Sequence, residues 1–315
     1  MPASILDSLL LFAGIIYDVI APIFLLMGVG FAVQRRLGLD IRTLTRLNFW
    51  IFVPVFLFVH FTESPLSGKD FALVAGHFTV LFCTMFALTW GIARLCGYED
   101  RLRRAMAASV LFYNSGNYGV PAAELAFGGA GVSVQAFVIL LQNFTNFTVG
   151  LALHAGAGGM KAREQLAAML RLPMIYVFVL AVTWRVFHWP IPAPLNTSLH
   201  LISDGMVPIA LVTFGAQMAT LKSYRFSRAM ALTIGLRLLV APFLGFCIVR
   251  ALNLHGVLAQ ALIVSTSFPT AVNAALLAIE FDNEPQFSSA VVFYSTLFSM
   301  LSVSLVIHLA KTFVR

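Results

Sequence analysis

Charged residues are scarce in this chain. Of its 315 residues, 10% are Asp, Glu, Lys or Arg and 60% are hydrophobic. Soluble domains carry about 25% charged residues, and membrane-spanning segments exclude charge because burying it in hydrocarbon is costly. The composition therefore excludes an ordinary soluble domain. It indicates an all-α, multi-pass membrane protein that is surrounded by the lipid bilayer.

Residues and motifs that carry catalytic or redox chemistry are also few. The three cysteines, Cys83, Cys96 and Cys247, lie in or beside apolar runs without CxxC spacing, so buried thiols are expected rather than a metal or redox site. The sequence has no HExxH motif and no serine placed between glycines as a nucleophile. We therefore expect no enzyme activity, no catalytic residue, no bound metal and no cofactor.

Ten apolar runs are long enough to cross a bilayer, for which about 20 residues are needed. They are apolar on all sides, unlike the surface helices of a soluble fold. The predicted spans are Leu9–Val33, Leu44–Phe61, Phe71–Leu95, Ala105–Phe127, Val132–Ala155, Leu172–Phe187, Leu199–Leu221, Ala229–Leu252, Leu258–Phe281 and Ser288–Phe313.

The basic residues divide unequally between the connections of these spans. Fourteen Lys and Arg residues fall on alternate connections that would share one side of the membrane, and five fall on the other side. Because short cytoplasmic loops are enriched in Lys and Arg, both termini are predicted to lie outside the cytoplasm, with the protein in the cell inner membrane. The net charge of +7 thus reflects topology, and no nucleic-acid partner is expected.

Prolines recur at an offset near 150 residues. The paired positions are separated by 151, 154 and 148 residues. This offset predicts two five-helix halves, residues 1–155 and 156–315. Because each half has an odd number of spans, the second half would enter the membrane inverted, as in many secondary transporters. The pairs are Pro22 with Pro173, Pro54 with Pro208, and Pro121 with Pro269.

The predicted fourth span contains a polar segment from Asn114 to Pro121. Its glycines have low helix propensity and its proline lacks a backbone N–H, so the helix is predicted to break here. Irregular backbone at membrane depth is buried in protein or lines a polar cavity, and the N–H groups that start the next half-helix attract an anion. A proline kink satisfied by neighbouring helices is the alternative. The predicted binding residues are Asn114, Ser115, Gly116, Asn117, Tyr118, Gly119 and Pro121.

A second polar segment, Ser265–Asn273, interrupts the predicted ninth span at the offset of the repeat. Taken alone, its Ser and Thr side chains could equally hold helices together. Paired with the first segment, it predicts a second broken helix, and two interrupted helices in matching positions point to a transport site. The fifth span adds Gln142 and two asparagines that share a face, and cavity lining and helix packing are equally expected for all three. Asn48 in the second span is a weaker candidate. The residues predicted to bind are Ser267, Pro269, Thr270, Asn273, Asn143 and Asn146.

Several stretches of the chain resemble the auxin efflux carrier family. The most specific is Phe268–Asn273, Phe-Pro-Thr-Ala-Val-Asn, and Met206–Leu211 and Leu236–Pro242 resemble the family's seventh and eighth helices. The short fifth connection differs from the long loop of many plant auxin exporters, so the chain is similar to a compact bacterial member. The resemblance implies ten helices whose fourth and ninth cross at mid-membrane, as in bile-acid symporters and sodium–proton antiporters. It also implies carriage of organic carboxylates such as malonate and malate.

Four charged residues are expected inside or near the spans. Arg237 falls well inside a span, where charges are functional by default. It could attract an anion, although an ion pair with Asp204 or Glu280 is favoured. Asp204, Glu124 and Glu280 are candidates for proton coupling, because a desolvated carboxyl can titrate near neutral pH. Solvated helix ends are an alternative of equal weight for these carboxylates.

Together these observations predict a secondary transporter of small organic anions, such as dicarboxylates or auxin-like acids. Two inverted repeats would give alternating access around the crossing of the broken helices. The alternative is a cation-coupled bile-acid-type symporter or a sodium–proton antiporter of the same fold, and an antiporter would need acidic residues at the crossing. A receptor with this fold would bind ligand without flux. Coupling to H+ or Na+, transport direction and assembly as a homodimer are left open.

Overall fold

The computed structural model of the chain describes residues 5–155, 163, 167, 170–221 and 225–314. Within these residues every regular element is helical, and one isolated antiparallel bridge joins Tyr113 to Thr270. Seven of the described helices are long and apolar enough to cross a membrane. They span Leu6–Leu37, Ile41–Thr62, Gly68–Leu95, Gly119–His154, Ala193–Thr220, Arg228–Ala251 and Pro285–Phe313.

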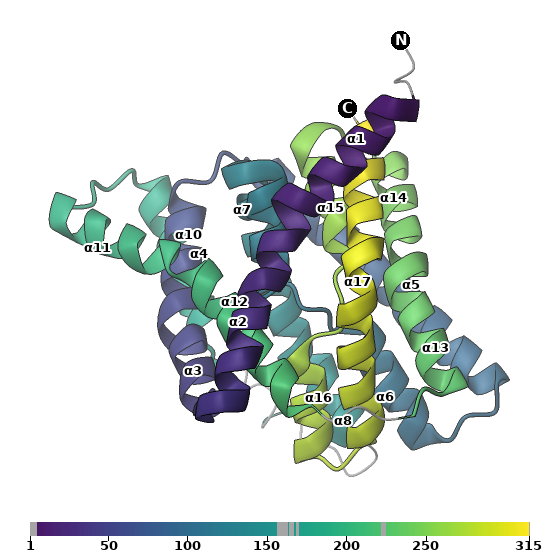
Figure 1. Cartoon of the computed structure of the whole chain (residues 1–315). Coiled ribbons are helices and arrows are strands. Elements are labelled where there is room, and N and C mark those ends of the chain that lie inside the picture. The colour runs from purple at the N-terminus through teal and green to yellow at the C-terminus, as the bar shows by residue number, and fades with distance from the viewer. Residues whose placement is uncertain (1–4, 156–162, 164–166, 168–169, 222–224, 315) are drawn as a thin grey trace.

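Bends and π-helical turns divide all of these long helices except Gly68–Leu95 and Pro285–Phe313 into shorter elements. Figure 1 labels the α-helices. The first part of the chain forms α1 (Ile5–Ile15), η1 (Ile16–Ile20), α2 (Ala21–Leu37), α3 (Ile41–Leu47), η2 (Asn48–Phe52), α4 (Val53–Thr62), α5 (Gly68–Leu95), α6 (Asp100–Leu111), α7 (Gly119–Thr145), η3 (Asn146–Gly150) and α8 (Leu151–Ala155). The second part forms α10 (Pro173–Val186), α11 (Ala193–Asp204), α12 (Met206–Thr220), α13 (Arg228–Gly235), η5 (Leu236–Val240), α14 (Ala241–Ala251), α15 (Gly256–Ser265), α16 (Val272–Glu280) and α17 (Pro285–Phe313).

Three π-helical segments each lie just before a proline. The segments η1, η2 and η5 end two residues before Pro22, Pro54 and Pro242. Proline cannot donate a backbone hydrogen bond, and its ring clashes with the carbonyl of the preceding turn. A widened turn relieves this clash. Pro22 and Pro54, two of the predicted repeat markers, therefore lie in helices that continue past them.

Three of the ten predicted spans are not among the seven long helices, and each is short or interrupted. The predicted sixth span is α10, with 14 residues. The fourth stops at the end of α6 and resumes in α7, which runs on into the fifth through a non-helical bend at Gly128 (φ 62°, ψ −157°). The ninth is divided between α15 and α16. The ten-helix count and the inverted halves 1–155 and 156–315 stay predictions.

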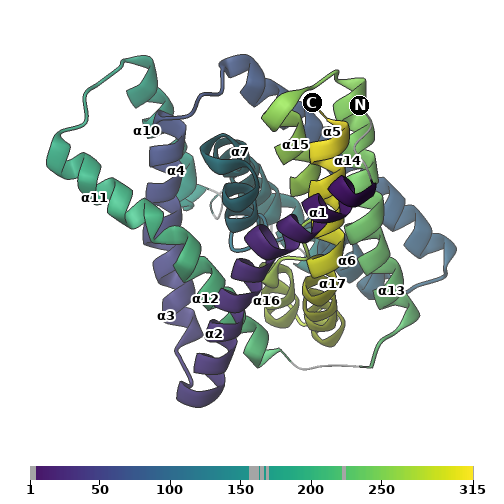
Figure 2. The ribbon, with the colours of Figure 1, turned by 45° about the horizontal axis from the view of Figure 1, so that its top comes forward.

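The described helices form two groups. In one group α2 packs on α12, α3 also contacts α12, and α4 contacts α10 and α11. In the other, α7 packs on α15, α5 on α6 and α14, and α16 on α17. Figures 1 and 2 show α4, α10 and α11 on one side and α5, α13 and α14 on the other. The start of α1 and the end of α17 lie at the same end of the molecule (Figure 1), as an even number of crossings requires. Which side of the membrane this is stays a prediction.

Two glycines allow α2 and α12 to touch backbone to backbone. A Cβ added at Gly30 would lie 2.1 Å from the Val212 carbonyl oxygen, and one added at Gly215 would lie 1.9 Å from the Met27 carbonyl oxygen. Small residues at helix contacts permit such approaches in membrane proteins, where packing rather than hydrophobicity drives helices together. These contacts hold the α2–α12 pair as one unit.

Candidate functional site

The two predicted breaks are hydrogen-bonded to each other. We call residues 112–118, between α6 and α7, the first interruption, and residues 266–271, between α15 and α16, the second interruption. The Asn114 N–H donates to the Pro269 carbonyl at 2.8 Å, and the Ala271 N–H donates to the Phe112 carbonyl at 2.8 Å. Backbone groups released from two helices are thus satisfied by each other.

Local sequence explains where the first interruption ends. The Gly119 N–H donates to the Asn114 carbonyl at 2.9 Å, and this bond closes the turn that leads into α7. Pro121 lies in the first turn of α7. Backbone N–H groups in the first turn have no acceptor within the helix, so a proline there costs no helical hydrogen bond. The break therefore precedes Pro121, and the proline belongs to the new helix.

Hydrogen bonds that involve side chains connect the interruptions to the helices around them. The Gln135 side-chain amide donates to the Ser115 carbonyl at 2.8 Å. The Thr270 hydroxyl donates to the Ser109 carbonyl at 2.7 Å, and the Thr270 N–H donates to the Ser295 hydroxyl at 3.1 Å. Because these bonds join different helices, they fix the geometry of both interruptions.

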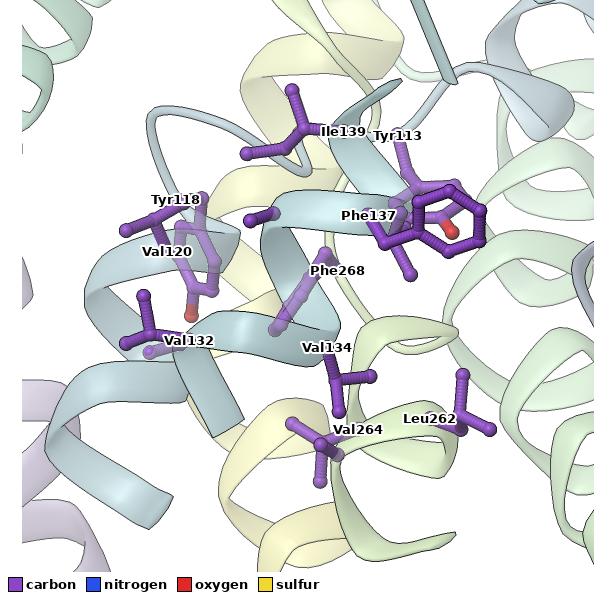
Figure 3. Close-up of a cluster of buried hydrophobic side chains, with 14 of the residues drawn as sticks. Tyr113, Tyr118, Val120, Val132, Val134, Phe137, Ile139, Leu262, Val264 and Phe268 are labelled. Atoms are coloured by element: carbon purple, nitrogen blue, oxygen red, sulfur yellow. The ribbon is translucent and has the colours of Figure 1, made fainter. Parts of the chain in front are cut away.

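An apolar cluster packs against the interruptions (Figure 3). Phe268 lies beside Tyr118, with ring centroids 5.7 Å apart, and both side chains are fully buried. A Cβ added at Gly119 would lie 2.7 Å from the Phe268 ring and 2.7 Å from the Gln135 amide nitrogen. The absence of a side chain at Gly119 therefore lets Phe268 and Gln135 approach the break.

A polar cavity of about 110 Å³ lies where the two interruptions meet. One water needs only about 15 Å³ on this measure, so the cavity is large enough for a small solute. Seven residues predicted to bind line it: Asn114, Ser115, Gly116, Asn117, Asn143, Asn146 and Asn273. The helix group that contains α3, α4, α10 and α12 supplies the opposite side of the cavity, so the cavity lies between the two groups. Its lining residues are Thr45, Asn48, Phe49, Val53, Met174, Thr213 and Gln217.

Several polar atoms of this cavity have no hydrogen-bond partner among the described residues. The Asn48 amide donates to the Asn117 side-chain oxygen at 2.9 Å, and the Gln217 amide donates to the Thr45 hydroxyl at 3.1 Å. Unpaired buried polar atoms call for an explanation such as a ligand or ordered water. Five such atoms belong to residues that line the cavity: Asn48 Oδ1, Asn114 Nδ2, Asn146 Oδ1, Thr213 Oγ1 and Gln217 Oε1.

Six predicted binding residues do not line the cavity. They shape the interruptions instead, through backbone bonds, packing or hydroxyl bonds within a helix. The Ser267 hydroxyl, for example, donates to the Val264 carbonyl at 2.6 Å. The six are Tyr118, Gly119, Pro121, Ser267, Pro269 and Thr270.

The predictions also missed residues that do line the cavity. Thr45, Thr213 and Gln217 are not among the residues considered from the sequence. Gln142, for which lining and packing were equally expected, does line the cavity, as does Asn48, the weaker candidate. Thr213 and Gln217 are four residues apart on α12 and therefore share one helix face. That spacing is the sequence signal that could have revealed them.

Arg237 is buried beside the cavity, where it contacts backbone carbonyls. Its Nη1 donates to the Val110 carbonyl at 2.8 Å, and its Nη2 donates to the Thr266 carbonyl. Its guanidinium carbon lies 4.5 Å from the centre of the Tyr113 ring. No ion pair in the described part of the chain includes Arg237. This corrects the ion pair expected from the sequence.

The carboxylates considered for coupling lie away from this cavity. Glu124 and Asp204 line a separate cavity of about 300 Å³ together with His60. Both carboxylates are exposed, and so is Glu280 at the end of α16. Their role in coupling stays a prediction.

The fold and the cavity together define an integral membrane protein with a polar site between two helix groups. A family model described as "Membrane transport protein" matches residues 15–167 and 163–307. Because the match covers nearly the whole chain, the protein belongs to this family, that of the auxin efflux carriers. The family resemblance inferred from the sequence is confirmed.

Three relatives illustrate the family. An "Uncharacterized transporter" of Methanothermobacter thermautotrophicus is 27% identical over 84% of this chain and 88% of its own length. A protein of Rhizobium meliloti named "Putative malonate transporter" is 24% identical over 94% of this chain and 96% of its own length. Auxin efflux carrier component 8 of Arabidopsis thaliana is 24% identical over 41% of this chain and 36% of its own length.

Proposed function

We propose that this protein is a secondary transporter of small organic anions, and that its substrate binds in the cavity between the two interruptions. The observation that carries the proposal is the set of unpaired buried side-chain atoms, led by Asn114 Nδ2, around a cavity formed by broken helices. A substrate carboxylate would accept hydrogen bonds from the Asn114 amide and the Thr213 hydroxyl, two donors without a partner among the described residues. Irregular backbone at membrane depth typically lines such sites.

The charge around the cavity favours an anion over a cation. Within the described residues, no Asp or Glu lines it. Val272 and Asn273, the first two residues of α16, do line it. The first N–H groups of a helix have no intrahelical partner and carry partial positive charge. A sodium–proton antiporter, which needs acidic ligands, is therefore the less supported alternative.

The position of the cavity supports alternating access. Its walls come from both helix groups, and the Asn48–Asn117 hydrogen bond joins one group to the other across it. In our proposal the chain forms ten helices in two inverted halves, and one group moves against the other around the bound anion. Opening toward one side would require the Asn48–Asn117 contact to lengthen.

Dicarboxylates are the substrates that we propose to test first. One relative that aligns with nearly the whole chain carries malonate in its name, and the cavity is small. We would reconstitute the purified protein in liposomes and measure uptake of labelled malonate. Unlabelled malate, indole acetic acid and a bile acid would compete in parallel. Inhibition by dicarboxylates, without effect of the bile acid, is the expected result.

The same vesicles test the coupling ion. Uptake would be compared with an imposed sodium gradient, an imposed proton gradient and neither gradient. Sodium-driven uptake of bile acid would support the cation-coupled symporter instead. If no acid enters the protein-containing vesicles faster than empty ones while malonate still binds to the purified protein, the chain is a receptor rather than a carrier.

A further inference from the structure

The guanidinium group of Arg237 binds the carboxyl ends of both broken helices. In a continuous helix each carbonyl accepts from the N–H four residues later. For Val110 that donor is Asn114, which bonds Pro269 instead. For Thr266 that donor is Thr270, whose N–H bonds a serine hydroxyl. Arg237 donates to these two carbonyls, Val110 and Thr266.

This arrangement suits the charges at helix ends. The carbonyls at the carboxyl end of a helix carry partial negative charge. Val110 lies at the end of α6, and Thr266 directly follows α15. A guanidinium presents several donors in a rigid fork, so one side chain can bind both ends at once. Arg237 therefore fixes where the two interruptions lie relative to each other.

Carbonyl dipoles stabilise Arg237 but carry no formal charge, so its guanidinium has no counter-ion among the described residues. A guanidinium stays protonated in proteins, and no carboxylate in the described residues pairs with it. The ring of Tyr113 stacks on the guanidinium, and Tyr113 is also one of the residues that line the cavity. A single residue thus connects the buried positive charge with the proposed substrate site.

We propose that Arg237 determines charge selectivity, so that its field makes the cavity prefer doubly charged anions over singly charged ones of similar size. The proposal rests on the proposed function of the cavity. Arg237 does not touch the substrate, so it acts as a positioning residue through Tyr113 and the two interruptions. In a low-dielectric surrounding the field of an unpaired charge extends beyond its first neighbours.

The test compares malonate with its monomethyl ester, which has one negative charge fewer at neutral pH. For each acid, KM and Vmax would be measured in proteoliposomes containing wild type, Arg237→Gln, Arg237→Lys or, as a matched control, Arg250→Gln. Arg250 is exposed near the end of α14. The selectivity is the KM of the ester divided by that of malonate.

We expect wild type to favour malonate and Arg237→Gln to lose about tenfold in selectivity. Arg237→Lys keeps the charge but not the fork, so its selectivity should stay within about twofold while Vmax falls. Arg250→Gln should behave as wild type. If Arg237 had a purely structural role, Arg237→Gln would lower the thermal stability of the protein. It would also lower Vmax by the same factor for both acids and leave the selectivity unchanged.

Each outcome decides between these accounts. Unchanged selectivity in Arg237→Gln overturns the proposal while leaving the proposed transport function intact. If Arg237→Gln does not fold, the Lys variant still decides, because a large loss of selectivity with the charge retained contradicts a charge effect. Absence of binding and transport of both acids by wild type overturns the proposed function and this inference together.

Discussion

The backbone N–H of Asn114 donates to the carbonyl of Pro269, and this 2.8 Å bond joins two interruptions from distant parts of the chain. Each interruption supplies what the other lacks, since a broken helix leaves both donors and acceptors unpaired. Ala271 and Phe112 form the reciprocal bond. The interruptions therefore form one structural unit, and a change in either should alter the cavity that both line.

Thr270→Val should weaken this unit without changing its shape. The substitution removes the 2.7 Å hydroxyl bond to the Ser109 carbonyl, at a cost of about 1 kcal/mol. We expect a lower thermal unfolding temperature and slower transport. Thr312→Val is the control, because its hydroxyl bonds only the His308 carbonyl of its own helix. Equal loss of transport in both variants would contradict the role given to Thr270.

Gly215→Ala should separate α2 from α12. The added Cβ would meet the Met27 carbonyl oxygen at 1.9 Å, and backbone cannot swing aside as a side chain can. Overpacking costs about 1–3 kcal/mol, so thermal unfolding in detergent should shift downward. Gly235→Ala is the matched control, since nothing lies within 4 Å of its added Cβ. A stable Gly215→Ala protein would show that this contact is not close in the membrane.

A short thiol cross-link between positions 48 and 117 should stop transport. Their side chains meet at 2.9 Å from opposite helix groups, so a link would hold the groups together in this state. The variant would combine Asn48→Cys and Asn117→Cys with replacement of Cys83, Cys96 and Cys247 by alanine. Reduction should restore uptake, and Asn48→Cys alone should be insensitive. Full uptake by the cross-linked protein would exclude relative movement of the groups there.

Both interruptions could be predicted from the sequence, because the loss of helix propensity is local. Glycine, proline and polar residues within an apolar run are enough to indicate a break. The hydrogen bonds confirm that the two breaks lie side by side. The sequence does not predict the exact position of the first break, because Pro121 belongs to the first turn of α7 and the break lies before it.

The far wall of the cavity could not be predicted in the same way. Asn48 is a single polar residue on an apolar helix, and the spacing of Thr213 and Gln217 is the only signal on α12. Such residues commonly serve only to hold membrane helices together. For Arg237 the sequence favoured an ion pair with a carboxylate, because a prediction from side chains alone does not consider backbone carbonyls that a helix break leaves without a partner. Its true partners depend on backbone geometry that the composition does not encode.

In our proposal, the cavity between the interruptions binds the transported anion. The most direct test of this claim is the KM for malonate uptake in proteoliposomes containing wild type, Asn117→Ala or Asn196→Ala. Asn117 lines the cavity, whereas Asn196 lies on α11 outside it. We predict that Asn117→Ala raises KM about tenfold through loss of buried hydrogen bonds, with Asn196→Ala unchanged. The same KM for all three proteins would contradict the claim.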